Sequence, residues 1–274
     1  QGPVASIAAA VCDFVGGART LTLQSACCAG TDAIGHGAAL VGAGEAEMAI
    51  CGGTEAPLYY HPMLELRMAG LSPSSAERPE QLCRPFDMWR TTGVVGEGAC
   101  MMVLEPEESP RPGYAFVSGY SYASDSDERP LGGLKCAIEQ CLADARTHST
   151  SIDMISAWGP GHRVIDAAEA KMLRDVFGSK LDEIAAVSIK GAIGNPFAAA
   201  GAIQIGTAAL GIRYSFIPPT VNWKHLDPSC RLNLSAHPRF VRSEVALINS
   251  HGLSGTNSAL LLHSCESRTS DSFC

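Results

Sequence analysis

The sequence lacks the features of a membrane-bound or exported protein. It has no apolar run of about 18 residues, the length that a membrane-spanning helix needs. Its first residues do not combine a basic segment, an apolar core and a cleavage site, as a signal peptide does. We therefore expect no membrane span and no export, and we expect a cytoplasmic location.

Cysteine frameworks for zinc or for disulfides are also missing. None of the 11 cysteines forms a CxxC pair, and Cys27 and Cys28 are adjacent. Cys51, Cys100 and Cys136 lie in apolar or Gly/Ala-rich stretches, as small hydrophobic residues do. We expect reduced thiols, no bound metal and no cofactor.

Positive charge is scarce. The chain has 20 Lys and Arg against 28 Asp and Glu, for a formal net charge of −8. Such a chain has no basic stripe for a phosphate backbone, so we expect no nucleic-acid partner. An acidic protein partner would need a local basic patch, and six residues are available for one: Arg84, Arg90, Arg111, Arg163, Lys171 and Arg174. Each of these, taken singly, is better explained as a solvated surface charge.

Apolar runs and helical patterns alternate along the chain, without repeats or low-complexity tracts. Together with 46% hydrophobic residues and 28 glycines, this alternation predicts a compact α/β fold with a mixed sheet. The predicted strands are residues 20–25, 47–51, 98–104, 114–122, 154–158, 185–189, 243–249 and 258–262. The predicted helices are residues 1–17, 26–44, 134–145, 167–177 and 198–210. Residues 71–90 are predicted to run over the surface, and residues 106–112 resemble a linker that divides the chain into 1–110 and 111–274.

A cysteine follows the predicted strand at residues 20–25, where the next helix begins. A thiolate at this position would face the N–H groups and the positive end of that helix, so Cys27 is a plausible nucleophile. Without further context, an inert buried cysteine is the more common case.

Several sequence blocks in order resemble those of the β-ketoacyl synthase family, and they extend over essentially the whole chain. They are residues 25–35, 50–55, 83–87, 96–99, 188–191, 199–202 and 249–257. The resemblance implies a thiolase-like layered fold of mixed sheets and helices, a thioester substrate on acyl carrier protein or coenzyme A, and dimerisation. It also places the nucleophile on Cys27 and the family's lysine on Lys190.

Both catalytic histidine positions of that family are changed in this chain. Trp158 stands at the first position, with Asp166 and Glu169 following at the family's spacing, and Asn195 stands at the second. In the family these imidazoles hydrogen-bond the malonyl thioester carbonyl while carbon dioxide leaves. Indole has no titration near neutrality, and an amide offers only a neutral donor, so decarboxylation should be impaired.

The expected pocket also departs from the family. His251 and Leu253 replace two phenylalanines, and Gly93 replaces a larger loop residue, as a flexible loop glycine or as a widened pocket wall. His251 lies in a loop that the family places beside the nucleophile, so a Cys–His pair could form there. His162 is a second candidate imidazole, although a structural role explains it better.

The resemblance is strongest to chain length factors, the non-condensing partners of type II polyketide ketosynthases. We therefore expect a polyketide or fatty-acid synthase subunit that does not condense, with acyl carrier protein and a ketosynthase subunit as partners in a heterodimer. A Cys27-dependent acyltransferase with His251 as base, and a pure scaffold, remain open. Only 26 residues precede Cys27, far fewer than in the family. We therefore expect either a fragment or a second polypeptide that completes the N-terminal part.

Overall fold

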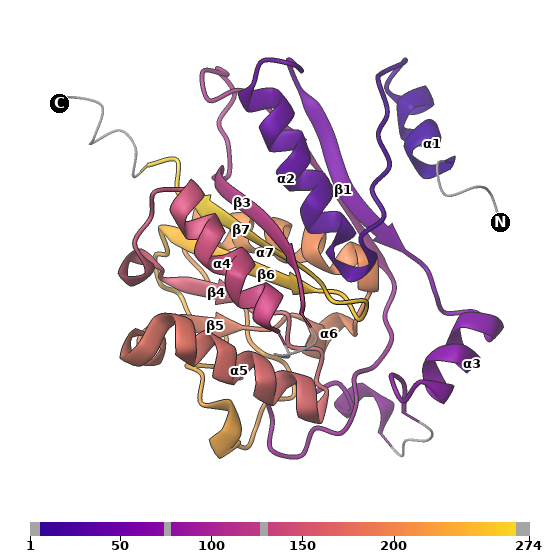
Figure 1. Ribbon diagram of the computed structural model, residues 1–274, viewed down its shortest axis with the longest axis vertical. Helices are drawn as coiled ribbons and strands as arrows, with labels where there is room; N and C mark the ends of the chain where they lie inside the picture. Colours follow the sequence, from indigo (N-terminus) through magenta and orange to yellow (C-terminus); the bar gives the residue numbers. More distant parts are fainter. Residues whose placement is uncertain (1–5, 74–77, 127–130, 267–274) are drawn as a thin grey trace.

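The computed structural model describes residues 6–73, 78–126 and 131–266 (Figure 1). Its α-helices are α1 (Ser6–Phe14), α2 (Ala29–Gly42), α3 (Tyr60–Met68), α4 (Gly132–Asp144), α5 (Arg163–Phe177), α6 (Lys190–Ile193) and α7 (Ala200–Tyr214). Its strands are β1 (Ala49–Glu55), β2 (Gly98–Leu104), β3 (Phe116–Ser124), β4 (Met154–Ser156), β5 (Ala185–Val187), β6 (Val245–His251) and β7 (Thr256–His263). The short 3₁₀ turns used below are η1 (Ala26–Cys28), η5 (Phe197–Ala199) and η6 (Pro228–Cys230).

The main sheet is mixed and has strands in the order β3-β7-β6-β4-β5. Strand β4 pairs parallel to both β5 and β6, whereas β7 pairs antiparallel to β6 and β3. Helices α4 and α5 cover one face, and α7 packs on the other (Figure 1). Every residue of β6 is buried, because helices cover both faces of the sheet there.

A second, two-stranded sheet lies on the far side of α2 and α7. Strands β1 and β2 pair antiparallel, and residues of β2 alternate between half-buried and exposed. The half-buried set, which includes Cys100 and Met102, faces α2 and α7 and joins the core around them. Helices α2 and α7 are therefore sandwiched between two sheets, which confirms the predicted layered α/β arrangement.

Glycines on α2 allow this close packing. A side chain at Gly35 would overlap the Tyr120 ring, and one at Gly37 would overlap the Cys51 sulfur atom. The first contact is with the main sheet and the second with the two-stranded sheet. The glycine-rich sequence of α2 therefore allows one helix to contact both sheets closely.

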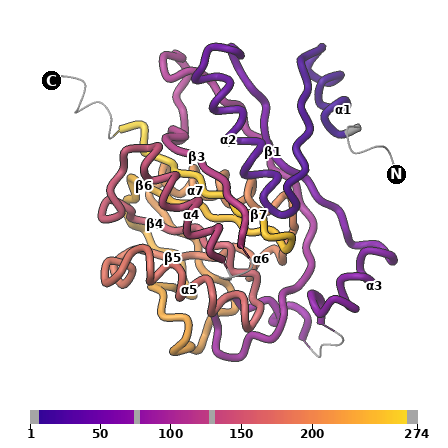
Figure 2. Tube along the Cα trace, viewed as in Figure 1, coloured from indigo at the N-terminus to yellow at the C-terminus, as the bar shows by residue number. Residues whose placement is uncertain are grey.

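Most of the predicted elements are confirmed, with shifts of a few residues at their ends. For the predicted helix at residues 1–17, residues 1–5 lie outside the described residues, and α1 spans Ser6–Phe14. The strand at residues 20–25 is wrong: this segment forms no ladder with any described strand and is largely exposed. Strand β1 also extends beyond the predicted residues 47–51, through Gly52 and Gly53, because both glycines pair with β2. Helix α3 was not predicted, and it stands apart from the layers in the Cα trace (Figure 2). None of its residues is buried, so it has no apolar face turned to a core.

The predicted surface excursion is partly wrong, because residues 86–90 are clamped to the start of α5. Phe86, Asp87 and Arg90 are buried. Asp166 of α5 accepts hydrogen bonds from the backbone N–H of Phe86 at 2.7 Å and of Gly161 at 3.1 Å. The guanidinium of Arg90 lies 3.5 Å from the same carboxylate. Charged residues that the sequence analysis assigned to the surface are therefore buried, and they anchor this loop inside the protein.

Removing the carboxylate of this clamp should strongly destabilise the fold. Asp166→Ala leaves buried N–H groups and the Arg90 guanidinium without their partner, at an expected cost of about 3–5 kcal/mol. Asp166→Asn should cost less, because its amide oxygen still accepts one hydrogen bond. Urea denaturation measures both values. The exposed Asp175 of the same helix is the control, and Asp175→Ala should change stability by less than about 0.5 kcal/mol. Equal stability of the Asp166→Ala and Asp175→Ala variants would contradict the clamp.

Candidate functional site

Cys27 lies in the tight turn η1, directly before α2. Ala26 has a left-handed backbone conformation, with φ of 53°, which is uncommon for a residue other than glycine. The Cys27 side chain is 5% exposed. The predicted elbow before the helix is confirmed, although an irregular extended segment leads into it instead of a strand.

Burial controls the ionisation of this thiol. It raises the pKa of Cys27 above the ordinary value, while the Lys190 ammonium and the Leu253 backbone N–H act in the opposite direction. The Leu253 contact also shows that the loop after β6 lies against the elbow. Gly252 also lies against the elbow, because a Cβ atom placed on Gly252 would lie 3.2 Å from the Cβ atom of Ala26.

Lys190 and Glu169 are fully buried and hold the backbone of Trp158 from two sides. Glu169 accepts hydrogen bonds from the backbone N–H of Trp158 and of Gly159, both at 2.8 Å. The Lys190 ammonium donates to the Trp158 carbonyl oxygen at 2.5 Å. Burial lowers the pKa of Lys190 to about 8, against the opposing effect of the Glu169 carboxylate. Both charged groups therefore position the loop at residue 158.

The Trp158 side chain is buried against His251. The two rings meet edge to face, with centroids 4.7 Å apart and planes at 69°. Trp158 is 1% exposed, and its indole Nε1 has no hydrogen-bond partner among the described residues. The buried Oδ1 of Asn195 likewise has none. Both positions that the resemblance assigns to the family's histidines therefore have a buried polar atom without a hydrogen-bond partner among the described residues.

Trp158 and Asn195 line one narrow cavity. The other lining residues are Leu71, Gly93, Val95, Pro160, His162, Ile165, Phe197 and Leu253. The cavity has room for about one water molecule. Cys27 is not among its lining residues, and it connects to the cavity through its contact with Leu253. Gly93 approaches the backbone closely, since a Cβ there would lie 2.8 Å from the Pro160 carbonyl oxygen, and the widened pocket wall stays a prediction.

His251 has a defined hydrogen-bonded orientation. Its Nδ1 lies 2.7 Å from the Asn257 Oδ1, and the Asn257 amide donates to the Asp125 carboxylate at 3.0 Å. Because Oδ1 can only accept, Nδ1 carries the hydrogen in this contact, and in the neutral ring the lone pair is on Nε2. No hydrogen bond joins the ring to Cys27 in the part of the chain that the structure describes. The predicted Cys–His pair stays a prediction.

His162 has the structural role that the sequence favoured. Its Nδ1 accepts from the backbone N–H of Val164 and of Ile165, which caps the first turn of α5.

Sequence reasoning did not identify the role of Asn249, whose amide donates to Glu169 at 2.7 Å. These two residues are 80 positions apart, so no local pattern could have paired them. The sequence offered two signals, the spacing of Asp166 and Glu169 and the block that begins at Asn249, but neither of them pairs Glu169 with Asn249.

Two family models match the chain in succession. The N-terminal domain of β-ketoacyl synthases matches residues 3–109, and the C-terminal domain matches residues 114–224. The chain is 33% identical over 258 residues to 3-oxoacyl-[acyl-carrier-protein] synthase 2 of Rhizobium meliloti (strain 1021), which covers 88% of this chain and 60% of the relative. It is 31% identical over 252 residues to the tetracenomycin polyketide synthase ketoacyl synthase alpha subunit of Streptomyces glaucescens, over 88% of this chain and 59% of that protein.

Solved structures agree with these matches. A ketosynthase bound to its type II polyketide synthase acyl carrier protein superposes with a TM-score of 0.90 at 26% identity, over 95% of this chain and 67% of that one. The ishigamide ketosynthase/chain length factor gives a TM-score of 0.87 at 26% identity, over 96% and 65%. The layered fold is therefore the thiolase-like fold of condensing enzymes. The chain belongs to the β-ketoacyl synthase family, and it spans about 60% of the length of these curated relatives.

None of the helices among the described residues is long and apolar enough to cross a membrane. In the same residues, no group of three or more His, Cys, Asp and Glu side chains is arranged to hold a metal ion.

The raised pKa of Cys27 predicts slow alkylation at neutral pH. Burial raises the pKa of the Cys27 thiol and keeps the thiol neutral at pH 7, and only the thiolate reacts. Alkylation of Cys27 by iodoacetamide, followed by peptide mass mapping, should accelerate as the pH rises past 9. Lys190→Met should slow it further, because the charge that favours the thiolate is lost.

The same cysteine in urea-denatured chain is the matched control for this measurement. It should react faster at pH 7 than Cys27 in the folded protein. Circular dichroism verifies that Lys190→Met is folded. Equal rates for folded and denatured chain at pH 7 would contradict a thiol held neutral by burial.

Proposed function

We propose that this chain is a non-condensing ketosynthase-like subunit of a polyketide or fatty-acid synthase. In this proposal it is the chain-length-factor-type partner of an active ketosynthase in the cytoplasm, with residues 1–110 and 111–274 as its two halves. The observation that carries the proposal is the buried Trp158 ring, packed edge-on against His251 at a position where the family has a catalytic histidine.

The chemistry of decarboxylation supports this proposal. Loss of carbon dioxide from a malonyl thioester leaves an enolate, whose oxygen needs hydrogen-bond donors aimed at it. The indole of Trp158 has a single N–H donor. Glu169 and Lys190 hold the backbone of Trp158 in place, which restricts where this donor can point. Losing one such donor commonly lowers the rate by about 10²–10³-fold. With both imidazoles replaced, the loss should be larger, although the effects do not add.

An exposed apolar surface supports a partner subunit. Ile50, Met101 and Val103 are exposed on the two-stranded sheet, on the face turned away from α2 and α7. Exposed apolar rows of this kind are typical of surfaces that another polypeptide covers. The ketosynthase/chain length factor among the similar structures supports a ketosynthase as that partner.

The isolated chain should not release carbon dioxide from malonyl acyl carrier protein. Trp158→His and Asn195→His, each alone, should not restore release, because each variant supplies only one imidazole. Trapping of labelled carbon dioxide measures the reaction, with an active ketosynthase as positive control and Cys27→Ala as background. Release by the wild-type chain at catalytic turnover would reject the non-condensing function.

Association with a ketosynthase should bury an extensive apolar interface. Obligate interfaces exceed about 2,000 Å² of total buried area, so the mixture should sediment as a heterodimer at micromolar concentration. Met101→Lys and Val103→Lys should weaken that association, because each places a charge on the apolar face. Sedimentation velocity of the chain with and without the ketosynthase measures this. A stable monomer in the presence of its ketosynthase would count against the proposal.

A second candidate is a Cys27-dependent acyltransferase that moves an acyl group without decarboxylation. The observation that favours it is the His251 tautomer, since a free Nε2 lone pair can act as a base. Intact-mass spectrometry after incubation with acyl carrier protein thioesters separates the candidates. Transfer to a second acceptor that is lost in both Cys27→Ala and His251→Ala would favour the acyltransferase.

A further inference from the structure

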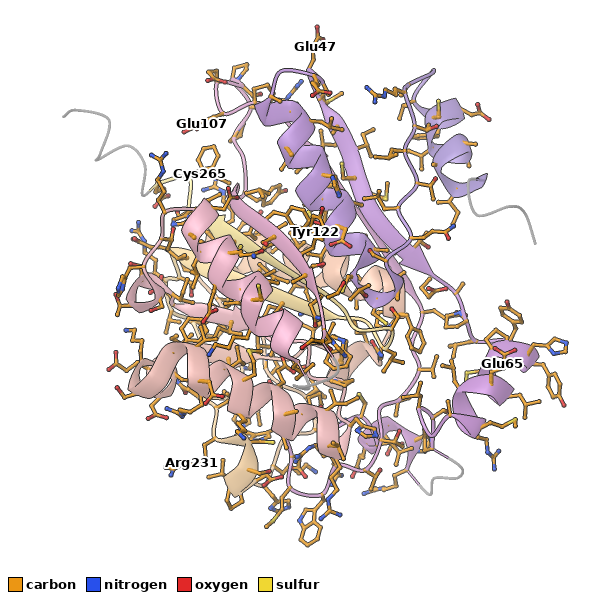
Figure 3. All side chains as sticks on the ribbon, viewed as in Figure 1. Glu47, Glu65, Glu107, Tyr122, Arg231 and Cys265 are labelled. Atoms are coloured by element: carbon orange, nitrogen blue, oxygen red, sulfur yellow. The ribbon has the colours of Figure 1, made fainter. Side chains whose placement is uncertain are left out.

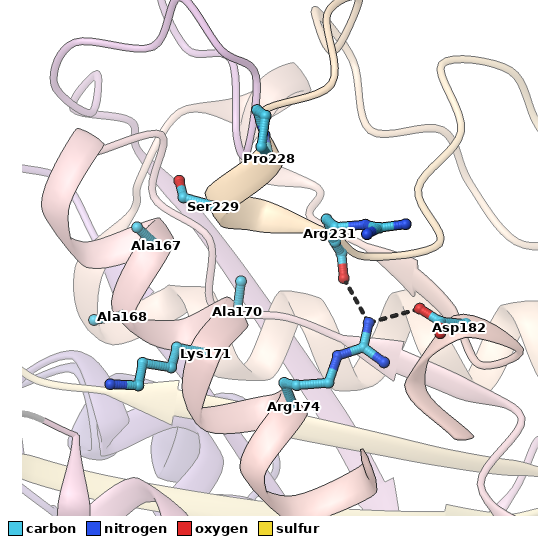
Figure 4. Close-up of a pocket in the computed structure, with 9 residues that line it drawn as sticks. All are labelled: Ala167, Ala168, Ala170, Lys171, Arg174, Asp182, Pro228, Ser229 and Arg231. Atoms are coloured by element: carbon cyan, nitrogen blue, oxygen red, sulfur yellow. Dashed lines mark hydrogen bonds and ion pairs between the residues drawn. The ribbon is translucent and has the colours of Figure 1, made fainter. Parts of the chain in front are cut away.

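Polar side chains outside the candidate site gather in a surface groove and in a buried cluster. The groove lies between α5 and η6 (Figure 4). There the Arg174 guanidinium has partners within the chain, because it donates to the Asp182 carboxylate at 2.6 Å and to the Arg231 carbonyl oxygen at 3.1 Å. The buried cluster surrounds Asp32 in the first turn of α2, five residues after Cys27. It therefore adjoins the elbow that carries the thiol.

Hydroxyl groups from three separate segments donate to the Asp32 carboxylate. Ser25, two residues before Cys27, donates to Oδ2. Tyr120 of β3 donates to Oδ1 at 2.9 Å, and Ser258 of β7 donates to the same oxygen atom. The Asp32 side chain is buried among these donors, with 7% exposure. Asp32 therefore connects the elbow with two strands of the main sheet.

The buried charge of Asp32 is compensated without a cation. In the part of the chain that the structure describes, no Lys, Arg or His side chain forms an ion pair with it. Its place in the first turn of α2 adds a favourable interaction with the helix dipole. Burial and the Asp32 carboxylate raise the pKa of Tyr120, so the phenol stays protonated and keeps donating. The carboxylate therefore depends on its hydroxyl donors.

Ser25 is held at its backbone as well as at its side chain. Its carbonyl oxygen accepts from the Thr256 hydroxyl and from the Cys28 backbone N–H, both at 3.1 Å. The next residue, Ala26, has the left-handed φ of 53°. In a residue other than glycine this conformation costs free energy, and it persists only where the surrounding contacts impose it. The contacts of Ser25 stand directly before the strained residue.

The charge of Asp32 acts mainly on the neighbouring thiol and not on Cys27. Burial raises the pKa of Cys27, and the charges that act on it are those of Lys190 and Glu55. Burial also raises the pKa of Cys28 to about 12, and here the Asp32 carboxylate contributes in the same direction. An influence of Asp32 on Cys27 therefore passes through the backbone of the elbow.

Aromatic rings join α2 and β3 independently of this carboxylate. The ring of His36 on α2 has its centroid 5.7 Å from that of Tyr120 and 6.3 Å from that of Tyr122. Figure 3 labels Tyr122 where β3 passes α2. Replacing Tyr120 by phenylalanine would keep this ring packing and remove only the hydroxyl group.

We propose that Asp32 is the positioning residue of the Cys27 elbow. Through the Ser25 hydroxyl, its carboxylate holds Ala26 in the left-handed conformation and keeps the Cys27 thiol buried. Tyr120 and Ser258 fix the carboxylate to the main sheet. This role goes beyond the proposed function, because a fixed elbow sets the reactivity of Cys27 whether or not the chain condenses.

Removing the Ser25 hydroxyl should release the elbow. Ser25→Ala should speed the alkylation of Cys27 by iodoacetamide at pH 7 about tenfold, because the thiol loses burial and its thiolate fraction rises. Ser25→Thr keeps a hydroxyl group and should react at the wild-type rate. Asp32→Ala should match Ser25→Ala, and the double variant should be no faster, since both changes break one contact. Fragment-ion mass spectrometry assigns the label to Cys27.

Tyr120→Phe is the matched control for a general loss of stability. It removes another donor of Asp32 but leaves Ser25 in place, so the alkylation rate should stay at the wild-type value. Low concentrations of urea provide a second control. Release of the elbow exposes little surface, so the faster alkylation of Ser25→Ala should depend weakly on urea, whereas unfolding would make it rise steeply.

The Ser25 variants keep the test decisive even if Asp32→Ala does not fold. Faster alkylation in Ser25→Ala alone, with Ser25→Thr and Tyr120→Phe at the wild-type rate, supports the positioning role. Equal acceleration in Ser25→Ala and Tyr120→Phe would overturn it, because the cluster would then contribute only stability. A wild-type rate in Ser25→Ala, or a steep urea dependence of its acceleration, would overturn it as well.

Discussion

The backbone of residue 158 is held by two fully buried charges, and the geometry of the site depends on this interaction. Glu169 binds the N–H groups of residues 158 and 159, and Lys190 binds the carbonyl oxygen of residue 158. A buried charge costs several kcal/mol unless hydrogen bonds compensate it, and here both charges are compensated mainly by backbone groups. The loop is therefore positioned whichever side chain residue 158 has.

These contacts to the backbone of residue 158 explain how the side chain at this position can change while the fold stays the same. A tryptophan at position 158 leaves the contacts of Glu169 and Lys190 intact, because neither contact involves the side chain. The indole packs against His251, and it fills apolar space that an imidazole would leave open. Retention of Lys190 is consequently no evidence of condensation, since its ammonium has a structural role that a non-condensing protein also needs.

The sequence predicted the elements whose patterns are local and missed those that depend on distant partners. The sequences of β2 and β6 both contain apolar runs, so both strands were predicted within a few residues. Residues 20–25 have β propensity but no described strand beside them, and propensity alone does not form a ladder. In the site, ordered sequence blocks located Cys27, Trp158 and Asn195. They could not reveal the bond between Glu169 and Asn249, which only the fold creates.

Helix α5 shows how one element can serve the site and a surface independently. Its buried side contains Asp166 and Glu169, which hold the loops around Trp158. Its outer side carries Lys171 and Arg174, which line a groove between α5 and η6. Because residues three and four apart share a helix face, Asp166 and Glu169 lie on one side of α5, and Lys171 and Arg174 lie on another. Substitutions on the outer side can therefore change the surface of α5 while Asp166 and Glu169 keep their contacts with the loops around Trp158.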